Sequence, residues 1–301
     1  MAGLMLLDTP SLYFRAYYGV PESMKAPDGM PVNAVRGLID MMATLVRAHS
    51  PGELVACMDA DWRPAFRVAA IPSYKLHRVA TGDEEQVPDT LAPQVPVIEQ
   101  VLDALGVARI GVPGYEADDV IGTCAARATG AVDIVTGDRD LFQLVDDVKP
   151  CRVLYTIKGI RNLQVIDEAA VTAKYGIPGR TYADFATLRG DPSDGLPGVP
   201  GVGEKTAAAL ITRFGSLDVL LAALDAGETD GFPAGSRNRL LAARDYLTVA
   251  PAVVKVAHDA PLPDADLTLP TKPRDPAALV ALSDRYDLGG PLNRLLAVLS
   301  G

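Results

Sequence analysis

Three short apolar segments that end at or near an aspartate constrain the fold more than any other feature of this chain. The segments and their aspartates are 4–7 with Asp8, 53–58 with Asp59 and 132–135 with Asp138. Residues with helical spacing of apolar side chains, such as 32–48, lie between them. Strands that alternate with amphipathic helices predict a parallel sheet. Because functional sites of such sheets lie beyond the carboxyl ends of the strands, we expect the three carboxylates to gather there.

Six further acidic residues lie near the ends of predicted elements or in a turn-rich loop. They are Glu116, Asp118, Asp119, Asp140, Asp191 and Asp194. Each one alone has an ordinary alternative role as a helix cap, a solvated helix face or a turn residue. Two like charges about 4 Å apart repel by roughly 4 kcal/mol near a protein surface, so a cluster needs neutralising cations. An oxygen-only donor set suits Mg²⁺ or Mn²⁺ rather than zinc. The working hypothesis is a two-metal phosphodiesterase site.

Composition excludes several other classes of protein. With 301 residues, 49% hydrophobic and 22% charged, the chain has the make-up of a globular protein with one large and one smaller domain. Three scattered cysteines and three histidines give little material for a disulfide framework, a zinc site or a Ser-His-Asp triad. The net charge of −10 argues against nucleic-acid binding over the whole surface but not in a local groove. Without a signal peptide or a membrane-length apolar run, a cytoplasmic location and no membrane partner are expected.

Basic and aromatic residues are interleaved in the segment 62–78. They are Trp62, Arg63, Phe66, Arg67, Tyr74, Lys75, His77 and Arg78. Residues 80–93 then form a polar, acidic stretch without a clear period, which indicates a long loop. The cations would grip a scissile phosphate or a single strand, with Tyr74 or Phe66 stacking on bases. A solvated surface helix is the alternative interpretation.

A glycine-rich segment, residues 198–206, opens a later helix. Small residues let the backbone approach a phosphate, and the helix that follows offers free N–H groups. The segment is not a P-loop, because Glu204 stands between Gly203 and Lys205. We predict a helix–hairpin–helix contact with a duplex backbone, which Arg213 on the same helix would extend. A plain tight turn between helices is the alternative.

Seven motifs, in order along residues 4–225, together resemble the bacterial 5′-nuclease (flap endonuclease) family. The family includes the N-terminal nuclease domain of family-A DNA polymerases. The motifs are residues 8–17, Phe66-Arg67, residues 74–78, 114–122, 136–144, 190–194 and 198–207.

The resemblance implies a fold and a division into domains. The expected fold is α/β: a PIN-like, mostly parallel sheet with flanking helices and a helical arch over the site. An all-helical, C-terminal helix–hairpin–helix domain follows. The expected bounds are 1–175 for the nuclease core, with the arch at about 62–95, and 176–301 for the duplex-binding domain with its C-terminal helices.

The resemblance also implies an activity. We expect a free-standing, structure-selective 5′-3′ exonuclease and 5′-flap endonuclease that removes flaps and RNA primers in DNA replication and repair. Its expected partners are branched or 5′-ended DNA and RNA–DNA primer junctions, with a DNA polymerase and a ligase as functional partners and a monomeric state. A non-catalytic DNA-structure binder on the same scaffold and a PIN-type ribonuclease remain alternatives.

Roles carried over from the family cover three groups of residues. The metal ligands, for two or more Mg²⁺ or Mn²⁺ ions, would be Asp8, Asp59, Glu116, Asp118, Asp119, Asp138, Asp140, Asp191 and Asp194. The residues that contact the scissile phosphate would be Lys75 and Arg78. The DNA-binding residues would be Arg67, Tyr74, Val199, Gly201, Val202, Gly203, Lys205 and Arg213. The hairpin backbone would also hold a K⁺ ion.

Overall fold

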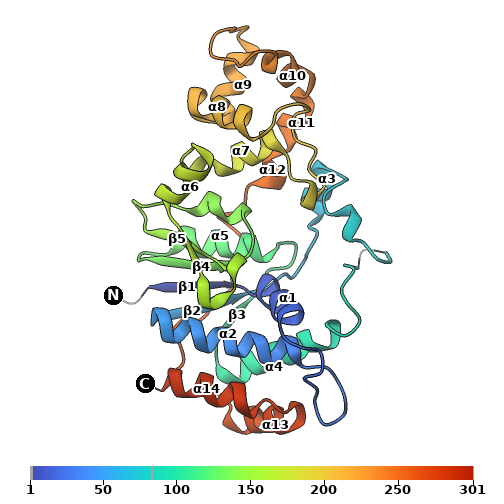
Figure 1. The fold of residues 1–301 in the computed structure, drawn as a ribbon, viewed down its shortest axis with the longest axis vertical. Helices are drawn as coiled ribbons and strands as arrows, with labels where there is room; N and C mark the ends of the chain where they lie inside the picture. Colours follow the sequence, from blue (N-terminus) through green and yellow to red (C-terminus); the bar gives the residue numbers. More distant parts are fainter. Residues whose placement is uncertain (1–2, 83, 301) are drawn as a thin grey trace.

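A six-stranded sheet forms the centre of the protein, as the computed structural model of residues 3–82 and 84–300 shows (Figure 1). The strands are β1 (Leu4–Asp8), β2 (Glu53–Cys57), β3 (Ala108–Ile110), β4 (Val132–Thr136), β5 (Cys151–Tyr155) and β6 (Gln164–Ile166). Their order is β3-β2-β1-β4-β5-β6. The first five run parallel and β6 pairs antiparallel with β5, so the predicted α/β class is confirmed.

Helices cover both faces of the sheet and form the part of the molecule farthest from it (Figure 1). They are α1 (Thr9–Gly19), α2 (Asn33–His49), α3 (Ala65–Ala70), α4 (Val95–Leu105), α5 (Ala117–Arg127), α6 (Glu168–Tyr175), α7 (Tyr182–Arg189), α8 (Glu204–Phe214), α9 (Leu217–Asp225), α10 (Ser236–Ala242), α11 (Arg244–Val249), α12 (Pro251–Val254), α13 (Pro276–Tyr286) and α14 (Gly289–Leu299). In the described part of the chain, no single helix is long and apolar enough to cross a membrane; only the pair α8 and α9, bent by 82°, passes that test together.

Both faces of β1 are buried, which explains why its sequence is apolar without alternation. Met5 and Leu7 pack with α2 and α4, whereas Leu4 and Leu6 pack with α5 on the other face. Because successive side chains point to opposite faces, one continuous apolar run supplies two core clusters. The carboxyl end of the strand, Asp8, then emerges at the edge of the sheet where α1 begins.

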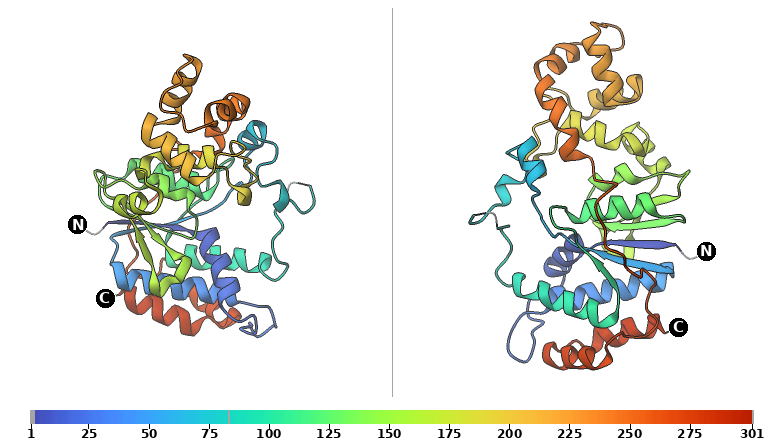
Figure 2. Two further views of the ribbon diagram at one scale, coloured as in Figure 1. Left: turned by 45° about the horizontal axis from the view of Figure 1, so that its top comes forward. Right: turned by 180° about the vertical axis from the view of Figure 1, so that it is seen from behind.

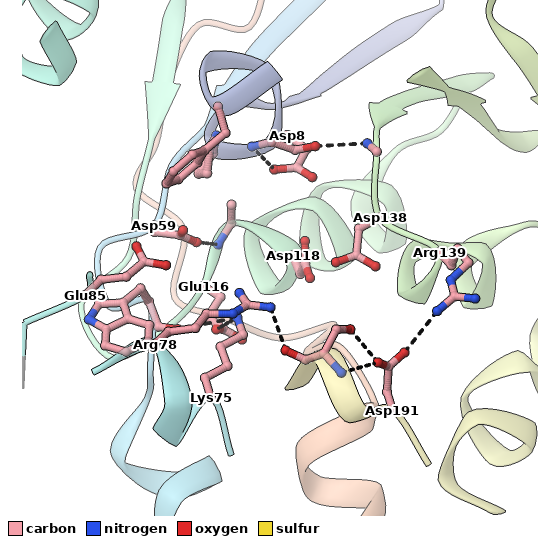
Figure 3. A pocket seen from close by; sticks show the side chains of 17 residues that line it. Asp8, Asp59, Lys75, Arg78, Glu85, Glu116, Asp118, Asp138, Arg139 and Asp191 are labelled. Atoms are coloured by element: carbon pink, nitrogen blue, oxygen red, sulfur yellow. Dashed lines mark hydrogen bonds and ion pairs between the residues drawn. The ribbon is translucent and has the colours of Figure 1, made fainter. Parts of the chain in front are cut away.

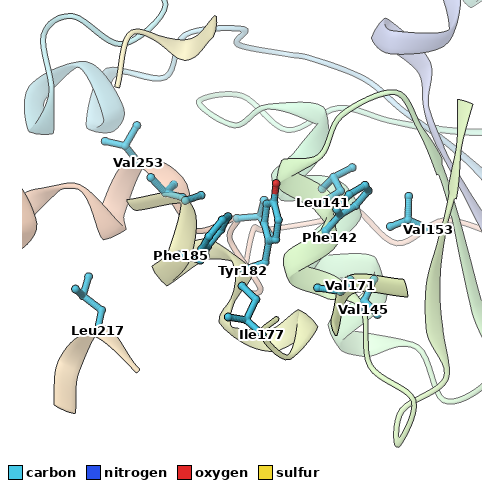
Figure 4. Packing of buried hydrophobic residues seen from close by; sticks show 14 of the residues in the cluster. Leu141, Phe142, Val145, Val153, Val171, Ile177, Tyr182, Phe185, Leu217 and Val253 are labelled. Carbon is cyan, nitrogen blue, oxygen red and sulfur yellow. The ribbon is translucent and has the colours of Figure 1, made fainter. Parts of the chain in front are cut away.

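The helical part of the molecule, from α7 to α12, is joined to the sheet-containing core by an aromatic cluster rather than by a flexible linker (Figure 4). Tyr182 of α7 lies 5.5 Å from Phe142 and 5.2 Å from Tyr175, measured between ring centroids. Phe185 extends the cluster on the α7 side, at 5.7 Å from Tyr182. All four rings are buried. The predicted boundary near residue 176 therefore lies within one continuous apolar cluster.

The C-terminal helices belong spatially to the core and not to the predicted 176–301 domain. After α12 the chain runs back behind the sheet, where Leu54 N donates to Leu267 O at 2.8 Å (Figure 2). Helix α14 then packs along α2, with Leu295 fully buried and Arg294 paired with Asp40 at 2.8 Å. This return covers an apolar face of α2 that would otherwise be exposed. The ends of both predicted domains, residues 1 and 301, lie outside the described residues.

The connection between β5 and β6 contains two 3₁₀ turns, at residues 156–158 and 160–162. One other expectation differs from the structure in detail. The predicted arch, where described, contains only α3 and 3₁₀ turns at 76–78 and 92–94, and an irregular chain links them beside the sheet (Figure 1).

Candidate active site

A cavity of about 310 Å³ lies beyond the carboxyl ends of β1, β2 and β4 (Figure 3). The acidic residues that line it and were predicted as ligands are Asp8, Asp59, Glu116, Asp118, Asp138 and Asp191. The predicted catalytic residues Lys75 and Arg78 line it as well. The structure therefore brings together six of the nine predicted ligands, and their role as ligands stays a prediction.

Helix starts place several of these carboxylates. Asp8 is the N-cap of α1: it accepts from Ser11 N at 3.2 Å and from Thr136 Oγ1 at 2.5 Å. Asp59 accepts from Ala117 N at 2.7 Å, at the first turn of α5. Capping and lining the cavity are thus compatible, because each carboxylate oxygen keeps a further lone pair after it accepts one hydrogen bond. From the sequence, capping a helix and binding a metal were alternative interpretations of Asp8. In the structure Asp8 caps α1 and also lines the cavity.

Burial and mutual repulsion make these carboxylates weak acids. Burial, followed by the charges of Asp138 and Asp59, raises the pKa of Asp8 to about 7 despite the hydrogen bond from Thr136. Burial likewise raises the pKa of Glu116 to about 7, against the opposing charges of Lys75 and Arg67. Negative charge in this cavity is therefore costly without a compensating cation.

Asp118 faces the cavity without a hydrogen-bond donor of its own within the described residues. Burial, followed by the charges of Asp8 and Asp138, raises its pKa well above the ordinary value. A carboxylate that lines a cavity without a donor of its own is a suitable ligand for a hard cation such as Mg²⁺ or Mn²⁺. By donor chemistry the residues around the cavity therefore fit a divalent ion.

The carboxylates surround the cavity rather than converge on one point. Across residues 3–82 and 84–300, no three acidic, histidine or cysteine side chains are arranged so that they could together hold a metal ion. The oxygen-only lining still matches the preference of a hard divalent cation. Side-chain rotations toward the centre would be needed to complete such a site.

Two basic residues bring positive charge to the same cavity. Lys75 contacts Glu116, and Arg78 donates to Ser193 O and to Asp194 Oδ1, each at 2.9 Å. Burial disfavours charge on Lys75, but the neighbouring Glu116 outweighs it, so the pKa of Lys75 lies well above its ordinary value. Lys75 stays protonated, which suits it to bind a phosphate and not to act as a general base.

Arg67 and Asp119 form a buried ion pair, and neither fits its predicted role. The Arg67 guanidinium donates to both oxygens of Asp119 at 2.8 and 2.7 Å, to Glu116 at 2.5 Å and to Val253 O at 3.1 Å. Asp119 also accepts from Glu116 N and Ala257 N. Only 2% of Arg67 and 0% of Asp119 is exposed, so Arg67 does not reach DNA and Asp119 does not reach the cavity.

Three other predicted residues lie away from the cavity. Tyr74 is buried and donates through its hydroxyl to Glu116 at 2.7 Å, so it does not stack on bases in this structure. Asp140 and Asp194 are not part of the cavity lining. Asp194 binds Arg78 instead. In the sequence, a carboxylate that lines the cavity looks the same as one that points away from it. Only the orientation of the element that carries it distinguishes the two.

The predicted duplex-binding hairpin forms the turn before α8. Val199 and Val202 are buried and anchor it, whereas Gly201, Gly203 and Lys205 are exposed. Arg213, on the same helix, lies 3.7 Å from Asp230. The segment therefore presents backbone and cationic groups at the surface, and its contact with DNA stays a prediction.

Sequence reasoning missed two cavity-lining charges, Arg139 and Glu85. Arg139 lies between the predicted ligands Asp138 and Asp140, and its guanidinium is 3.4 Å from Asp191. Its position between two ligands was the available signal. Glu85 reaches the cavity from the irregular loop, for which no period exists in the sequence.

Comparison with known proteins places the chain in a family. A family model described as 5′-3′ exonuclease, N-terminal resolvase-like domain, matches residues 3–176. A second one, described as 5′-3′ exonuclease, C-terminal SAM fold, matches residues 177–277. The chain belongs to the 5′-3′ exonuclease family. The resemblance inferred from the motifs is confirmed, and the protein is a nuclease.

Relatives with this family's name match nearly the whole chain. A 5′-3′ exonuclease of Streptomyces coelicolor is 64% identical, over 98% of this chain and 100% of that protein. A 5′-3′ exonuclease of Mycobacterium tuberculosis is 50% identical, over 98% of this chain and 97% of that protein. DNA polymerase I of Mycobacterium tuberculosis is 46% identical, but the match covers 74% of this chain and only 24% of the polymerase.

Solved structures share the fold at low sequence identity. The T5 D15 protein, co-crystallised with metal ions, has a TM-score of 0.66 and 16% identity, over 99% of this chain and 98% of that one. The catalytic core of Rad2 in complex with a DNA substrate has a TM-score of 0.58 and 17% identity, over 99% of this chain and 93% of that one. The predicted fold class is confirmed.

The raised pKa of Asp8 predicts a pH-dependent stability difference. The pKa rises from 3.8 to about 7, so the folded protein binds the extra proton between those values and loses stability as pH rises through them. In EDTA, the free energy of unfolding of Asp8→Asn minus that of wild type should therefore increase by about 2 kcal/mol from pH 5 to pH 8. Urea unfolding at each pH measures this difference in stability. Asp264→Asn, at an exposed site, is the control, and a pH-independent difference for Asp8→Asn would contradict the assignment.

The buried Arg67–Asp119 pair predicts a large loss of stability without a DNA-contact signature. Arg67→Met leaves an uncompensated buried carboxylate and should lower the free energy of unfolding by about 3–5 kcal/mol. Arg67→Lys, which keeps the charge, should lose less. Denaturant unfolding gives both values. The exposed Arg47→Met is the control and should change stability by less than about 0.5 kcal/mol. An Arg67→Met protein of wild-type stability would contradict this structural role.

Proposed function

We propose that the protein is a metal-dependent, structure-selective 5′-3′ exonuclease and 5′-flap endonuclease. The observation that carries this proposal is the cavity in which Asp8, Asp118 and Asp138 lie opposite Lys75 and Arg78. Carboxylates that hold cations and basic side chains that hold a phosphate are the two halves of a phosphodiesterase site. Membership in the 5′-3′ exonuclease family supports the polarity of cleavage.

The cofactor proposed is Mg²⁺ or Mn²⁺, in two or more copies. Asp8, Asp59, Glu116, Asp118, Asp138 and Asp191 would hold the ions, because they line the cavity. Such ions supply positive charge beside the scissile phosphate and make a nearby water more acidic. The related T5 protein was crystallised with metal ions, including zinc, which supports a divalent site in this fold.

The chain's own residues would bind and orient the phosphodiester. Lys75 stays charged and points into the cavity from the segment after α3. Arg78 and Arg139 lie on the side of Asp191 and Ser193. Charge-assisted hydrogen bonds from these groups would fix the phosphate and favour the charge that develops during cleavage. Glu116 would have to exchange its contact with Lys75 for a cation.

A basic groove of about 890 Å³ continues from the cavity, with which it shares Ser11, Phe14 and Gly137. The cations that line the groove are Arg15, Lys158 and Arg161, and no hydrogen bond or ion pair holds them within the described residues. Tyr18, 74% exposed, lies at its edge. Free cations and an exposed aromatic ring suit a nucleic-acid strand that extends beyond the cleavage point.

The substrates proposed are branched or 5′-ended DNA and RNA–DNA primer junctions. Solved relatives of the fold carry DNA, including T5 D15 with DNA and GEN1 with a Holliday junction. Similarity to DNA polymerase I supports work beside a polymerase and a ligase in replication and repair. We further propose a monomer in the cytoplasm.

Cleavage of a 5′-labelled flap oligonucleotide tests this function. Wild type should cut it in Mg²⁺ or Mn²⁺ and not in EDTA. Asp118→Ala removes a carboxylate that lines the cavity and should reduce the single-turnover rate by about 1000-fold or more. Asp194→Ala removes one outside the lining and should reduce it by only about tenfold.

The outcomes test two claims separately: that the protein is a metal-dependent nuclease, and that Asp118 matters more than Asp194. No metal-dependent cleavage by wild type would overturn the proposed function. Equal, complete loss in Asp118→Ala and Asp194→Ala would leave a nuclease but contradict the cavity-based ranking. Thermal unfolding of each variant confirms that the proteins compared are folded.

A further inference from the structure

The duplex-binding hairpin has a rigid base and an exposed tip. Val199 N donates to Leu188 O, and Val202 N donates to Val199 O, each at 2.9 Å. The side chains of Val199 and Val202 are buried beneath it. At the tip, Gly201 has a φ of +76°, a conformation that side chains other than glycine rarely adopt. The backbone of the tip is therefore fixed and accessible.

Arg239, 38 residues further along the chain, lies against this tip. Its Nη1 donates to Gly201 O at 2.9 Å. A Cβ atom placed on Gly201 would lie 3.1 Å from Nε and 3.2 Å from Cζ of Arg239, so the guanidinium packs directly on the glycine. The glycine thus permits both the turn and the approach of the cation.

Helix α10 holds Arg239 in this position. Leu240, the next residue, is fully buried, and Ser236 at the start of the helix is buried and donates to Pro233 O at 2.7 Å. Arg239 itself is exposed. The charge is therefore placed by a packed helix and not by a free side chain on a loop.

The hairpin with Arg239 in place does not fit the K⁺ ion that the family resemblance implied. The carbonyl of Gly201 accepts the Arg239 hydrogen bond, and the carbonyl of Val199 accepts from Val202 N. Two positive charges a few ångströms apart repel, so the guanidinium opposes a second cation at the same carbonyls. The chain supplies the positive charge itself.

We propose that Arg239 is a built-in cation of the hairpin that binds a backbone phosphate of duplex DNA and replaces a monovalent ion there. A guanidinium has five N–H donors, so a hydrogen bond to Gly201 leaves others for a phosphate. Lys205 and the first N–H groups of α8 lie on the same exposed turn and add to the site. This inference rests on the proposed function, in which the hairpin holds the duplex.

Equilibrium binding of a fluorescent flap duplex in EDTA tests the role without cleavage. At equal ionic strength, wild type should bind with the same Kd, within about twofold, in K⁺, Na⁺ and tetramethylammonium chloride. Arg239→Gln should weaken binding by about tenfold and reduce the slope of log K against log salt by about one. Arg239→Lys should keep most of the slope. Arg237→Gln, on the same helix but bonded to Glu228 O, is the matched control and should bind like wild type.

Two results would overturn the inference. One is wild-type binding at least fivefold tighter in K⁺ than in tetramethylammonium, which would show a cation site and needs no variant. The other is a folded Arg239→Gln protein with unchanged affinity and salt slope. Absence of both binding and metal-dependent cleavage in wild type would instead overturn the proposed function, so the two failures are distinguishable.

Discussion

Repulsion among the carboxylates that gather at the carboxyl ends of β1, β2 and β4 is the constraint on which the rest of this structure depends. The parallel sheet brings the carboxylates together, and burial then raises the pKa of Asp8 and Glu116 to about 7. The protein offsets part of this charge with Lys75 and Arg67, which both contact Glu116. What remains uncompensated faces the cavity, where Asp118 has no donor within the described residues. This residual charge is what a divalent cation would neutralise.

The buried ion pair between Arg67 and Asp119 also joins three parts of the chain that are distant in sequence. Arg67, on α3 at the base of the irregular loop, binds Asp119 on α5 and the carbonyl of Val253 on α12. Asp119 also accepts from Ala257, where the chain leaves the helical part. The loop over the cavity, the helix that carries the acidic residues and the helical part thus meet at one buried ion pair. The elements around the cavity and the helical part are therefore joined at this pair as well as at the aromatic cluster around Tyr182.

Sequence alone predicted the elements that depend on local pattern. Asp8 and Asp59 were found because an apolar strand precedes each, and strand direction fixes where they lie. Asp118 and Asp119 were not separable, because neighbouring residues on a helix differ only in which side they face. Arg67 read as a surface cation because its partners are 49 and 52 residues away. The return of α14 onto α2 and the approach of Arg239 to Gly201 are long-range contacts of the same kind. No spacing rule encodes such contacts, so only the folded chain reveals them.

The central claim is that the strand-end carboxylates hold divalent cations, and a crystal structure with Mn²⁺ tests it most directly. Crystals grown at neutral pH and measured near the manganese absorption edge locate each ion by its anomalous signal. The account predicts a peak inside the cavity, within about 2.2 Å of oxygens from at least two of Asp8, Asp118 and Asp138. Asp119 should remain on Arg67, away from the ion. Saturating Mn²⁺ with no peak in the cavity, or an ion bound by Asp119 in place of Asp118, would contradict it.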